Sequence, residues 1–354
     1  MQVKVEPFGF MPDGTAVSRF VLATDSGLTV SLIELGAGIQ DITMPDQRGN
    51  IGSVVLGYDD LEGYLGSSFI QALTVGPVAN RINGAEFVID GVRYWLEKNY
   101  QDAHHLHGGK YGLHAQLWRG RIRSLTDRSA CVVFEYTRRH MQGGYPGNLR
   151  LFVTYELYEN GELRVDYFGV TDMATPVALT NHAYFRLGNT PDVLPCELSI
   201  NATQYLPVGV GMIPTGKIAS VANTPLDFRH ARTIGRQIAE EHSAIRGADG
   251  FDVGFYLNTG GSLTPIAATL FAPDTGRKLT LMTTSQALQL FTAQNLSGKL
   301  GRNGEALVKH GAVCLEPGSF TDALNQSSLG QDVILRPGKQ YRQTSIYKFE
   351  ALTQ

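Results

Sequence analysis

The sequence predicts an all-β protein, a large antiparallel β-sandwich with one or two short helices. Turn residues separate short β-rich runs throughout, and Gly accounts for 40 of the 354 residues, where about 7% is average. Helical periodicity is scarce, and closely spaced short strands are typical of a sandwich. With 43% hydrophobic residues, the chain is long enough to bury a sizeable core. We find no linker or repeat, so we expect one domain over residues 1–354.

The clearest elements lie in the middle of the chain. Ala130 to Thr137 is rich in β-branched and aromatic residues and predicts a strand. Leu149 to Leu157 and Leu163 to Val170 predict a hairpin, because Asn160-Gly161 between them favours the positive φ angles of a type I′ turn. Phe228 to Ile245 has the strongest helical pattern. Strand order stays open, because sandwiches, barrels and jelly rolls share these local signals.

Charge and composition exclude several classes of partner. The formal net charge is −3 and no Lys/Arg-rich run occurs, so we expect no nucleic-acid partner. The chain has no apolar leader and no stretch of about 18 uncharged apolar residues, so we expect neither export nor membrane contact. Cys131, Cys196 and Cys314 are odd in number and widely spaced among apolar residues. This pattern predicts buried free thiols and a cytoplasmic location.

Two titratable residues interrupt apolar, strand-like segments. His182 lies within the run Val177 to Phe185, where it is either a proton donor and acceptor or a core histidine satisfied by a neighbouring backbone group. Glu316 follows the apolar residues 312–315 and has no Lys or Arg adjacent in sequence. Burial without a cation would raise the pKa of this carboxyl towards the range of a useful base. The alternative is a structural salt bridge with a distant cation.

A histidine-rich segment offers two interpretations. His104, His105 and His107 stand beside Gly108-Gly109, and imidazoles are common metal ligands. No fourth ligand follows at a recognisable spacing, and His114 alone is weak support. A loop in which glycines let a ligand approach the backbone and one histidine binds it is favoured, so we expect no metal.

Polar and aromatic groups elsewhere suit a hydroxyl-rich ligand. Asn80-Arg81 precedes a turn and Asp252 lies between apolar residues, although each pattern is often only a loop ion pair. Aromatic side chains that could stack on a sugar, or simply fill the core, are Trp95, Trp118, Tyr145 and Phe185. No nucleotide-binding glycine motif, nucleophile elbow or Cys-x-x-Cys pair is present. The sequence therefore predicts no cofactor.

A series of short segments runs in order over nearly the whole chain. They are Gly36-Ala37-Gly38, Leu56-Gly57-Tyr58-Asp59, Ala79-Asn80-Arg81-Ile82, Leu106-His107-Gly108-Gly109, Gly144-Tyr145-Pro146-Gly147, Thr180-Asn181-His182, Gly250-Phe251-Asp252, Leu315-Glu316, Asp322-Ala323 with Asn325, and Leu335-Arg336-Pro337-Gly338. Taken together, these segments resemble the aldose 1-epimerase (galactose mutarotase) family. An ordered series of this length is far more specific than any one of its members.

The resemblance implies a sugar-binding cleft across one sheet of a mutarotase-type sandwich and cofactor-independent interconversion of the α and β anomers of a free aldose. It implies that Glu316 takes the anomeric hydroxyl proton, that His182 protonates the ring oxygen and that His107 assists. The residues that would bind the sugar hydroxyls are Asn80, Arg81, Asp252 and Gln289. We expect the base and the acid on opposite sides of a gap the size of one pyranose ring.

The chain departs from the family pattern at six positions. They are Pro77, Arg186, Val253, Gly254, Gly318 and Thr321. We interpret them as an altered sugar-contacting rim and hypothesise a preferred substrate other than galactose or glucose. Two alternatives remain, a carbohydrate-binding or sensor protein on the same fold, and a phosphosugar epimerase that uses Arg186. In each case the expected partner is a small sugar, and the expected state is a monomer or homodimer.

Overall fold

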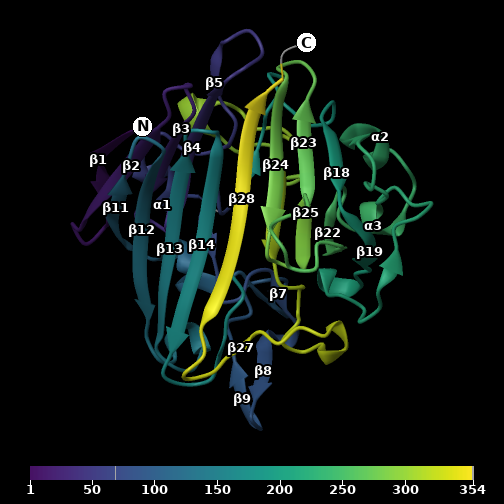
Figure 1. Ribbon diagram of the computed structural model, residues 1–354. Helices are drawn as coiled ribbons and strands as arrows, with labels where there is room; N and C mark the ends of the chain where they lie inside the picture. Colours follow the sequence, from purple (N-terminus) through teal and green to yellow (C-terminus); the bar gives the residue numbers. More distant parts are fainter. Residues whose placement is uncertain (68, 353–354) are drawn as a thin grey trace.

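The computed structural model describes residues 1–67 and 69–352, and within them the chain forms a β-sandwich (Figure 1). One layer is a nine-stranded sheet whose ladders are all antiparallel. In spatial order its strands are β11 (Arg119–Leu125), β12 (Ser129–Arg138), β13 (Leu149–Tyr158), β14 (Glu162–Thr171), β28 (Tyr341–Ala351), β24 (Arg277–Thr283), β23 (Ala268–Ala272), β18 (Glu197–Ile200) and β21 (Arg232–Thr233).

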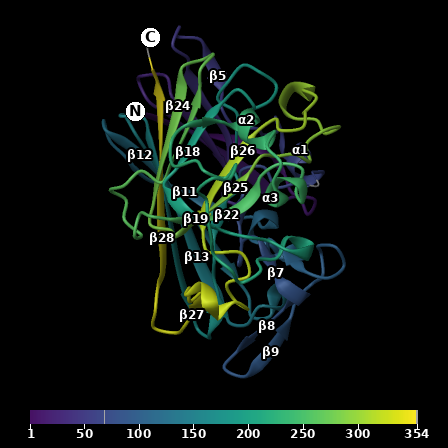
Figure 2. The same ribbon diagram turned by 90° about the vertical axis from the view of Figure 1, so that its right-hand side faces the viewer.

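Two smaller sheets lie behind this layer (Figure 2). The six-stranded sheet has the order β17 (Tyr184–Phe185), β26 (Val313–Gly318), β25 (Ala287–Phe291), β22 (Asp252–Leu257), β19 (Ala202–Leu206) and β20 (Ala219–Ser220). The five-stranded sheet runs from β1 (Gln2–Phe10) through β2 (Ala16–Ala23), β3 (Thr29–Ile33) and β4 (Gly38–Pro45) to β5 (Ile51–Ser53). The remaining strands form two-stranded pairs: β6 (Thr74–Val75) with β16 (Thr180–Asn181), β7 (Arg81–Ile82) with β10 (His105–Leu106), β8 (Glu86–Ile89) with β9 (Val92–Trp95), and β15 (Thr175–Pro176) with β27 (Ile334–Leu335).

The predicted hairpin and the strand before it are confirmed. Strands β13 and β14 pair in register from Leu149 opposite Thr171 to Leu157 opposite Leu163, with Gly161 at a φ of +84° in the turn. The three cysteines are free and buried, as predicted. Among the aromatic candidates, Trp118, Tyr145 and Phe185 are buried in the hydrophobic core, whereas Trp95 is 68% exposed.

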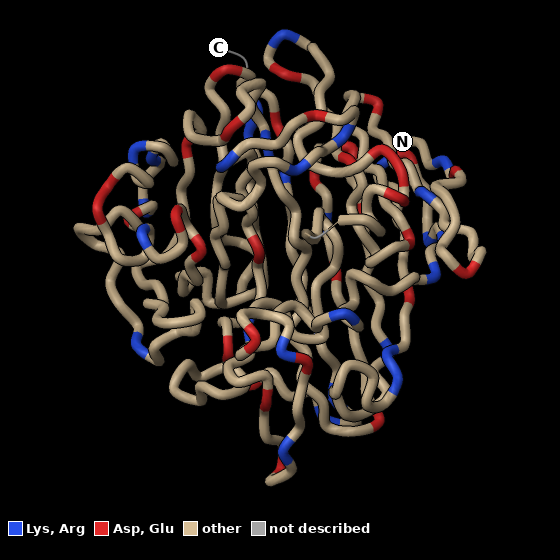
Figure 3. The backbone as a smooth tube through the Cα atoms, turned by 180° about the vertical axis from the view of Figure 1, so that it is seen from behind, with Lys and Arg blue, Asp and Glu red and all other residues tan. Residues whose placement is uncertain are grey.

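The described residues contain three short α-helices, α1 (Leu61–Leu65), α2 (Ile234–Ile238) and α3 (Ser243–Arg246). The helical pattern over 228–245 therefore yields two helices and not one, because His242 adopts an extended conformation and caps α3 by accepting from the Ala244 N–H. No helical pattern in the sequence predicts α1. None of these helices combines the length and apolar character needed to cross a membrane. Lys/Arg and Asp/Glu positions are mixed around the molecule (Figure 3).

The main core fills the space between the layers. Alternate residues of β13, including Leu151 and Val153, belong to the same buried cluster as Leu288 and Leu290 of β25 and Leu315 of β26. Because successive side chains of a strand point to opposite faces, the residues between these core positions lie on the far face of the six-stranded sheet. That face carries the candidate site.

Candidate active site

A cleft of about 780 Å³ opens over the far face of the six-stranded sheet. Six of the seven predicted site residues line it, namely Asn80, Arg81, His107, His182, Asp252 and Glu316. The seventh, Gln289, borders a small adjoining cavity that Asp252 also lines. Residues more than 230 positions apart in the sequence therefore meet in one cavity.

Strand register places the three polar residues of the sheet. Asp252 on β22, Gln289 on β25 and Glu316 on β26 alternate with the core residues of their strands. Gln289 stands opposite Glu316 in the ladder, and its Nε2 donates to Asp252 Oδ1 at 2.6 Å. The sheet therefore holds an amide between two carboxyl groups on one surface.

His182 follows β16 and precedes β17, at the point where the chain enters the sheet. Its backbone N–H donates to Leu73 O at 3.1 Å, and its carbonyl accepts from Ala72 N at 2.9 Å. The imidazole stacks on the Tyr184 ring at 4.9 Å with an interplanar angle of 8°, and the edge of Phe291 packs nearby. The backbone bonds position the chain at His182, and the aromatic contacts pack the ring against the floor of the cleft.

His182 and Glu316 lie side by side, with 3.6 Å between Nε2 and Oε1, and both side chains are less than one-tenth exposed. The expectation of opposite sides of a pyranose-sized gap is therefore wrong, because no ring fits between groups at this separation. The error lies in the chemistry assumed for the substrate. The anomeric hydroxyl and the ring oxygen of an aldose are bonded to the same carbon, so an acid and a base that serve both can lie close together on one side of the sugar.

Burial shifts the pKa values of both groups away from their charged forms. Burial raises the pKa of the Glu316 carboxyl well above its ordinary value; the charge of Asp252 adds to this, and Arg81 opposes it. Burial lowers the pKa of the His182 imidazole to about 4. These directions favour a protonated carboxyl beside a neutral imidazole over an ion pair. Such perturbed groups in a cleft are typical of acid and base chemistry.

A tight loop brings His107 against His182, with the ring centroids 5.4 Å apart. His107 has a φ of +56° and Gly108 a φ of +86°. A Cβ on Gly108 would meet the Gly76 carbonyl oxygen at 2.1 Å, so only glycine fits there. His107 Nδ1 accepts from Asn80 N at 3.1 Å, and burial lowers the pKa of the imidazole well below its ordinary value.

The neighbouring histidines of this segment point elsewhere. His105 is buried with Nδ1 against Glu97 O at 2.7 Å, and His104 Nδ1 accepts from Gly84 N. Neither lines the cleft. Among the described residues, the segment therefore fits the loop interpretation, with one histidine directed at a ligand, and these three histidines do not converge on a metal.

An ion pair forms part of the wall of the cleft. Arg81 Nη2 donates to Asp252 Oδ2 at 3.0 Å, and the two side chains are 10% and 12% exposed. The guanidinium also donates to Asn80 Oδ1 at 3.0 Å and to the Tyr100 hydroxyl at 3.3 Å. The pair is thereby held rigid while it offers both signs of charge to hydroxyl groups in the cavity.

Sequence reasoning missed several residues that line the cleft. Tyr184 and Phe291 form its aromatic floor, and Tyr100 and His114 stand on its walls. Tyr184 lies two residues after His182, so strand alternation could have indicated it. Tyr100 lies in a loop and His114 in the short 3₁₀ helix Leu113–Ala115, and in neither does a periodic pattern point to a ligand.

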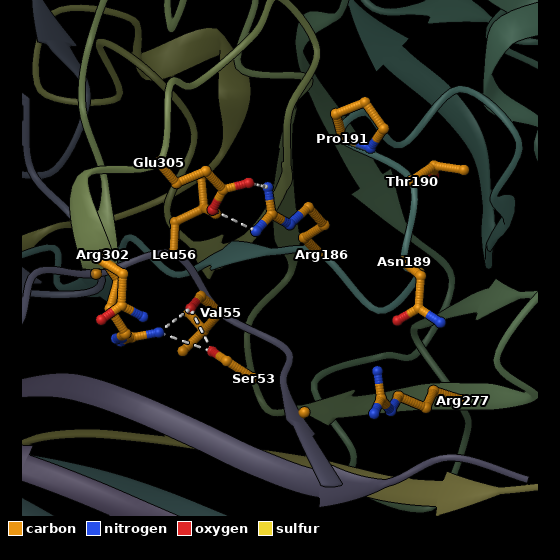
Figure 4. Close-up of a pocket in the computed structure, with 14 residues that line it drawn as sticks. Ser53, Val55, Leu56, Arg186, Asn189, Thr190, Pro191, Arg277, Arg302 and Glu305 are labelled. Carbon is orange, nitrogen blue, oxygen red and sulfur yellow. Dashed lines mark hydrogen bonds and ion pairs between the residues drawn. The ribbon is translucent and has the colours of Figure 1, made fainter. Parts of the chain in front are cut away.

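None of the six residues that depart from the family pattern lines the cleft. Val253 is a core residue, and Gly254 and Thr321 border only the small cavity beside Gln289. Arg186 lies in a separate pocket of about 370 Å³, where it forms a bidentate ion pair with Glu305 (Figure 4). The interpretation of these residues as a sugar-contacting rim is therefore wrong for Arg186 and Val253, and Arg186 is not available to a phosphate in the cleft.

Comparison with known proteins agrees with this geometry. The model of the family described as aldose 1-epimerase matches residues 18–348. The chain is 38% identical to galactose mutarotase of Bos taurus over 346 residues, and 32% identical to aldose 1-epimerase of Escherichia coli over 342 residues. These alignments cover 96–97% of this chain and 97% of each relative.

Solved structures give the same result. The crystal structure of galactose 1-epimerase from Lactobacillus acidophilus superimposes with a TM-score of 0.86 at 25% identity, covering 99% of this chain and 98% of that one. An aldose epimerase homologue from C. elegans superimposes with a TM-score of 0.85 at 28% identity, covering 96% and 100%. The sandwich, the cleft and the sequence all lead to the same assignment, and the chain belongs to the aldose 1-epimerase family.

Proposed function

We propose that the protein is a mutarotase that opens and recloses the cyclic hemiacetal of a free aldose with its own side chains and without a cofactor. The single observation that carries this proposal is the contact between Glu316 and His182 on the floor of the cleft. Mutarotase and epimerase relatives over almost the full chain support it. A protein that only binds sugar has no need of two adjacent buried groups with opposed pKa shifts.

Ring opening needs two proton transfers at neighbouring oxygens. The Glu316 carboxylate accepts the O1 proton while protonated His182 gives a proton to the ring oxygen; the C1–O5 bond breaks and C1=O1 forms. Glu316 is then protonated and His182 neutral, which is the distribution that burial favours. Rotation about C1–C2 and the reverse transfers close the other anomer. Each transfer typically contributes about 10²–10⁴-fold.

The remaining polar residues are proposed to hold the sugar. His107, fixed by Asn80, faces His182 and would bind near the ring oxygen. The Arg81–Asp252 pair and Gln289 offer donors and acceptors for the other hydroxyls. The charges of Arg81 and Asp252 already compensate each other, so this part of the cleft is suited to a neutral ligand such as a free sugar.

Galactose, the sugar in the relatives' names, is the proposed substrate. The hypothesis of a different sugar depended on an altered rim, but none of those six positions lines the cleft. We also propose a single domain, since the main core cluster extends from Phe20 to Phe349, and a cytoplasmic location, which the three free cysteines support.

Polarimetry from pure α anomers of several aldoses tests the function. The wild type should accelerate mutarotation of galactose, Glu316→Gln should lose about 10³-fold or more in kcat, and Glu305→Gln, outside the cleft, should match the wild type. A wild type that accelerates no sugar, but binds one by calorimetry, would support the binding-protein alternative.

A further inference from the structure

Cys314 lies beside the proton-transfer pair but takes no part in the proposed reaction. It precedes Glu316 by two residues on β26, so both side chains lie on the same face of the strand. Its neighbours across the ladder are Tyr184 and Phe291, the two aromatic residues that pack against the His182 ring. The thiol is fully buried beneath this aromatic floor.

We propose that His182, Cys314 and Glu316 form a binding site for a thiophilic divalent cation such as Zn²⁺, and that binding of the cation inhibits the enzyme. Inhibition depends on the proposed function, whereas cation binding does not.

The donor atoms are already close to the arrangement that a zinc ion requires. One donor atom from each of the three residues lies within 4.8 Å of the other two. Tetrahedral zinc has bonds of about 2.0–2.3 Å to N, O and S, which places neighbouring ligand atoms roughly 3.3–3.7 Å apart. The His182 to Glu316 distance of 3.6 Å is in this range, and the 4.8 Å limit means that the sulfur has to approach by at most about 1 Å.

The chemistry of the three donors selects the cation. A thiolate and an imidazole favour Zn²⁺ and similar soft or borderline ions, whereas Mg²⁺ and Ca²⁺ take oxygen ligands. A thiolate and a carboxylate together balance the double charge of the ion, so the buried site is neutral when filled. The cleft leaves the fourth position to a water molecule or a sugar hydroxyl, as in zinc sites with three protein ligands.

Cation binding removes the groups that ring opening needs. The metal–sulfur bond replaces the thiol proton, which passes to solvent. The metal also takes the lone pair with which His182 would hold a proton, and a Glu316 oxygen with which it would accept one. Neither transfer to the sugar can then occur. Cys314 is the only one of the three ligands that can be removed without touching the proposed machinery.

Zinc titration of the chelator-treated full-length enzyme tests the inference. Wild-type mutarotation should fall with added Zn²⁺, should recover with EDTA, and should not respond to Mg²⁺. Cys314→Ala should keep the metal-free rate, yet need about a hundredfold more Zn²⁺ for half-inhibition, since even loss of an outer partner of a ligand typically costs about 10- to 100-fold in affinity. Cys314→Ser, nearly equal in size, serves if the alanine variant folds poorly.

Cys196→Ala is the matched control, because Cys196 is also a buried free thiol but does not belong to the cluster of His182, Cys314 and Glu316. This variant should respond to Zn²⁺ like the wild type. Added Co²⁺ should give a thiolate-to-metal charge-transfer band that the Cys314 variants lack, a readout that needs no activity. Equal zinc sensitivity of wild type and Cys314→Ala, or absence of that band in the wild type, would overturn the inference. A wild type with the band but no mutarotation would instead contradict only the proposed function.

Discussion

Replacing Asp252 by Asn removes one charge of the buried ion pair and leaves the Arg81 guanidinium without its carboxylate. Asn is nearly isosteric, so it keeps an oxygen near Arg81 Nη2 and a contact with Gln289. The substitution therefore tests charge and not shape. Both ionic side chains are about nine-tenths buried, so water only partly replaces the lost partner.

Breaking a buried ion pair by removing one member typically costs about 3–5 kcal/mol. Arg81 keeps its bonds to Asn80 and Tyr100 and its position over the Tyr100 ring, which places the expected loss near the lower limit, about 3 kcal/mol. The unfolding entropy is about 2.1 cal/mol/K per residue, and the chain has 354 residues, so this loss of stability should lower the Tm by about 4 °C. A lost charge-assisted hydrogen bond to the sugar, about 1.5–3 kcal/mol, should lower kcat/KM by about 10- to 100-fold.

Thermal unfolding and polarimetric kinetics measure the two effects. The control is Glu305→Gln, which breaks the bidentate pair with Arg186 outside the cleft (Figure 4). That pair is 19% and 39% exposed, so its loss should cost at most about 1 kcal/mol and leave KM unchanged. The reasoning fails if Asp252→Asn unfolds at the wild-type temperature, or if both variants lose the same stability and activity.

Three further predictions concern stability around the cleft. Burial lowers the pKa of His114 to about 4, so the unfolded chain binds more protons than the folded one between pH 4 and 6.5. The free energy of unfolding should therefore fall by up to about 3 kcal/mol as the pH drops through this window. Urea unfolding of His114→Gln should show a smaller loss of stability over the same pH range. Arg138→Met leaves the buried carbonyl oxygens of Pro146 and Gly147 without the guanidinium that donates to them, whereas Tyr145 O keeps the Met141 N–H. This variant should lose about 2–5 kcal/mol in urea unfolding, with unchanged kcat per folded molecule. Gly108→Ala should lower both Tm and kcat because its Cβ would collide with Gly76, whereas Gly330→Ala, at a similar φ but in open space, should cost only about 1 kcal/mol.

Much of the fold could be predicted because the nine-stranded sheet obeys local rules. Strand β14 alternates core and surface residues over its length, and a glycine with positive φ ends the hairpin. The short helices were harder. Strand β21 and helix α2 follow each other directly, and in such short elements tertiary packing, not periodicity, decides the conformation. The order of the strands needed the coordinates, since no residue pattern encodes it.

The site residues could be named from the sequence, but their arrangement could not. Glu316 was conspicuous as a carboxyl group in a strand that is buried on both faces. The prediction that Glu316 and His182 lie on opposite sides of the sugar was based on the size of the ring. In the structure, the distance between them is set by the pairing of β26, which carries Glu316, with β17, which directly follows His182. Likewise, only the structure shows that Arg186 belongs to another pocket.

The same features explain why this surface is suited to chemistry. Buried charges are normally paired, but the carboxyl group of Glu316 lies 3.6 Å from an imidazole that burial also keeps neutral. A fully paired Glu316 would be more stable but would not exchange a proton near neutral pH. The Arg81–Asp252 pair, with Asp252 two strands away on β22, shows the alternative, since its charges satisfy each other. Catalysis is therefore expected where the sheet leaves its titratable groups without a permanent ionic partner, and sugar binding where it pairs them.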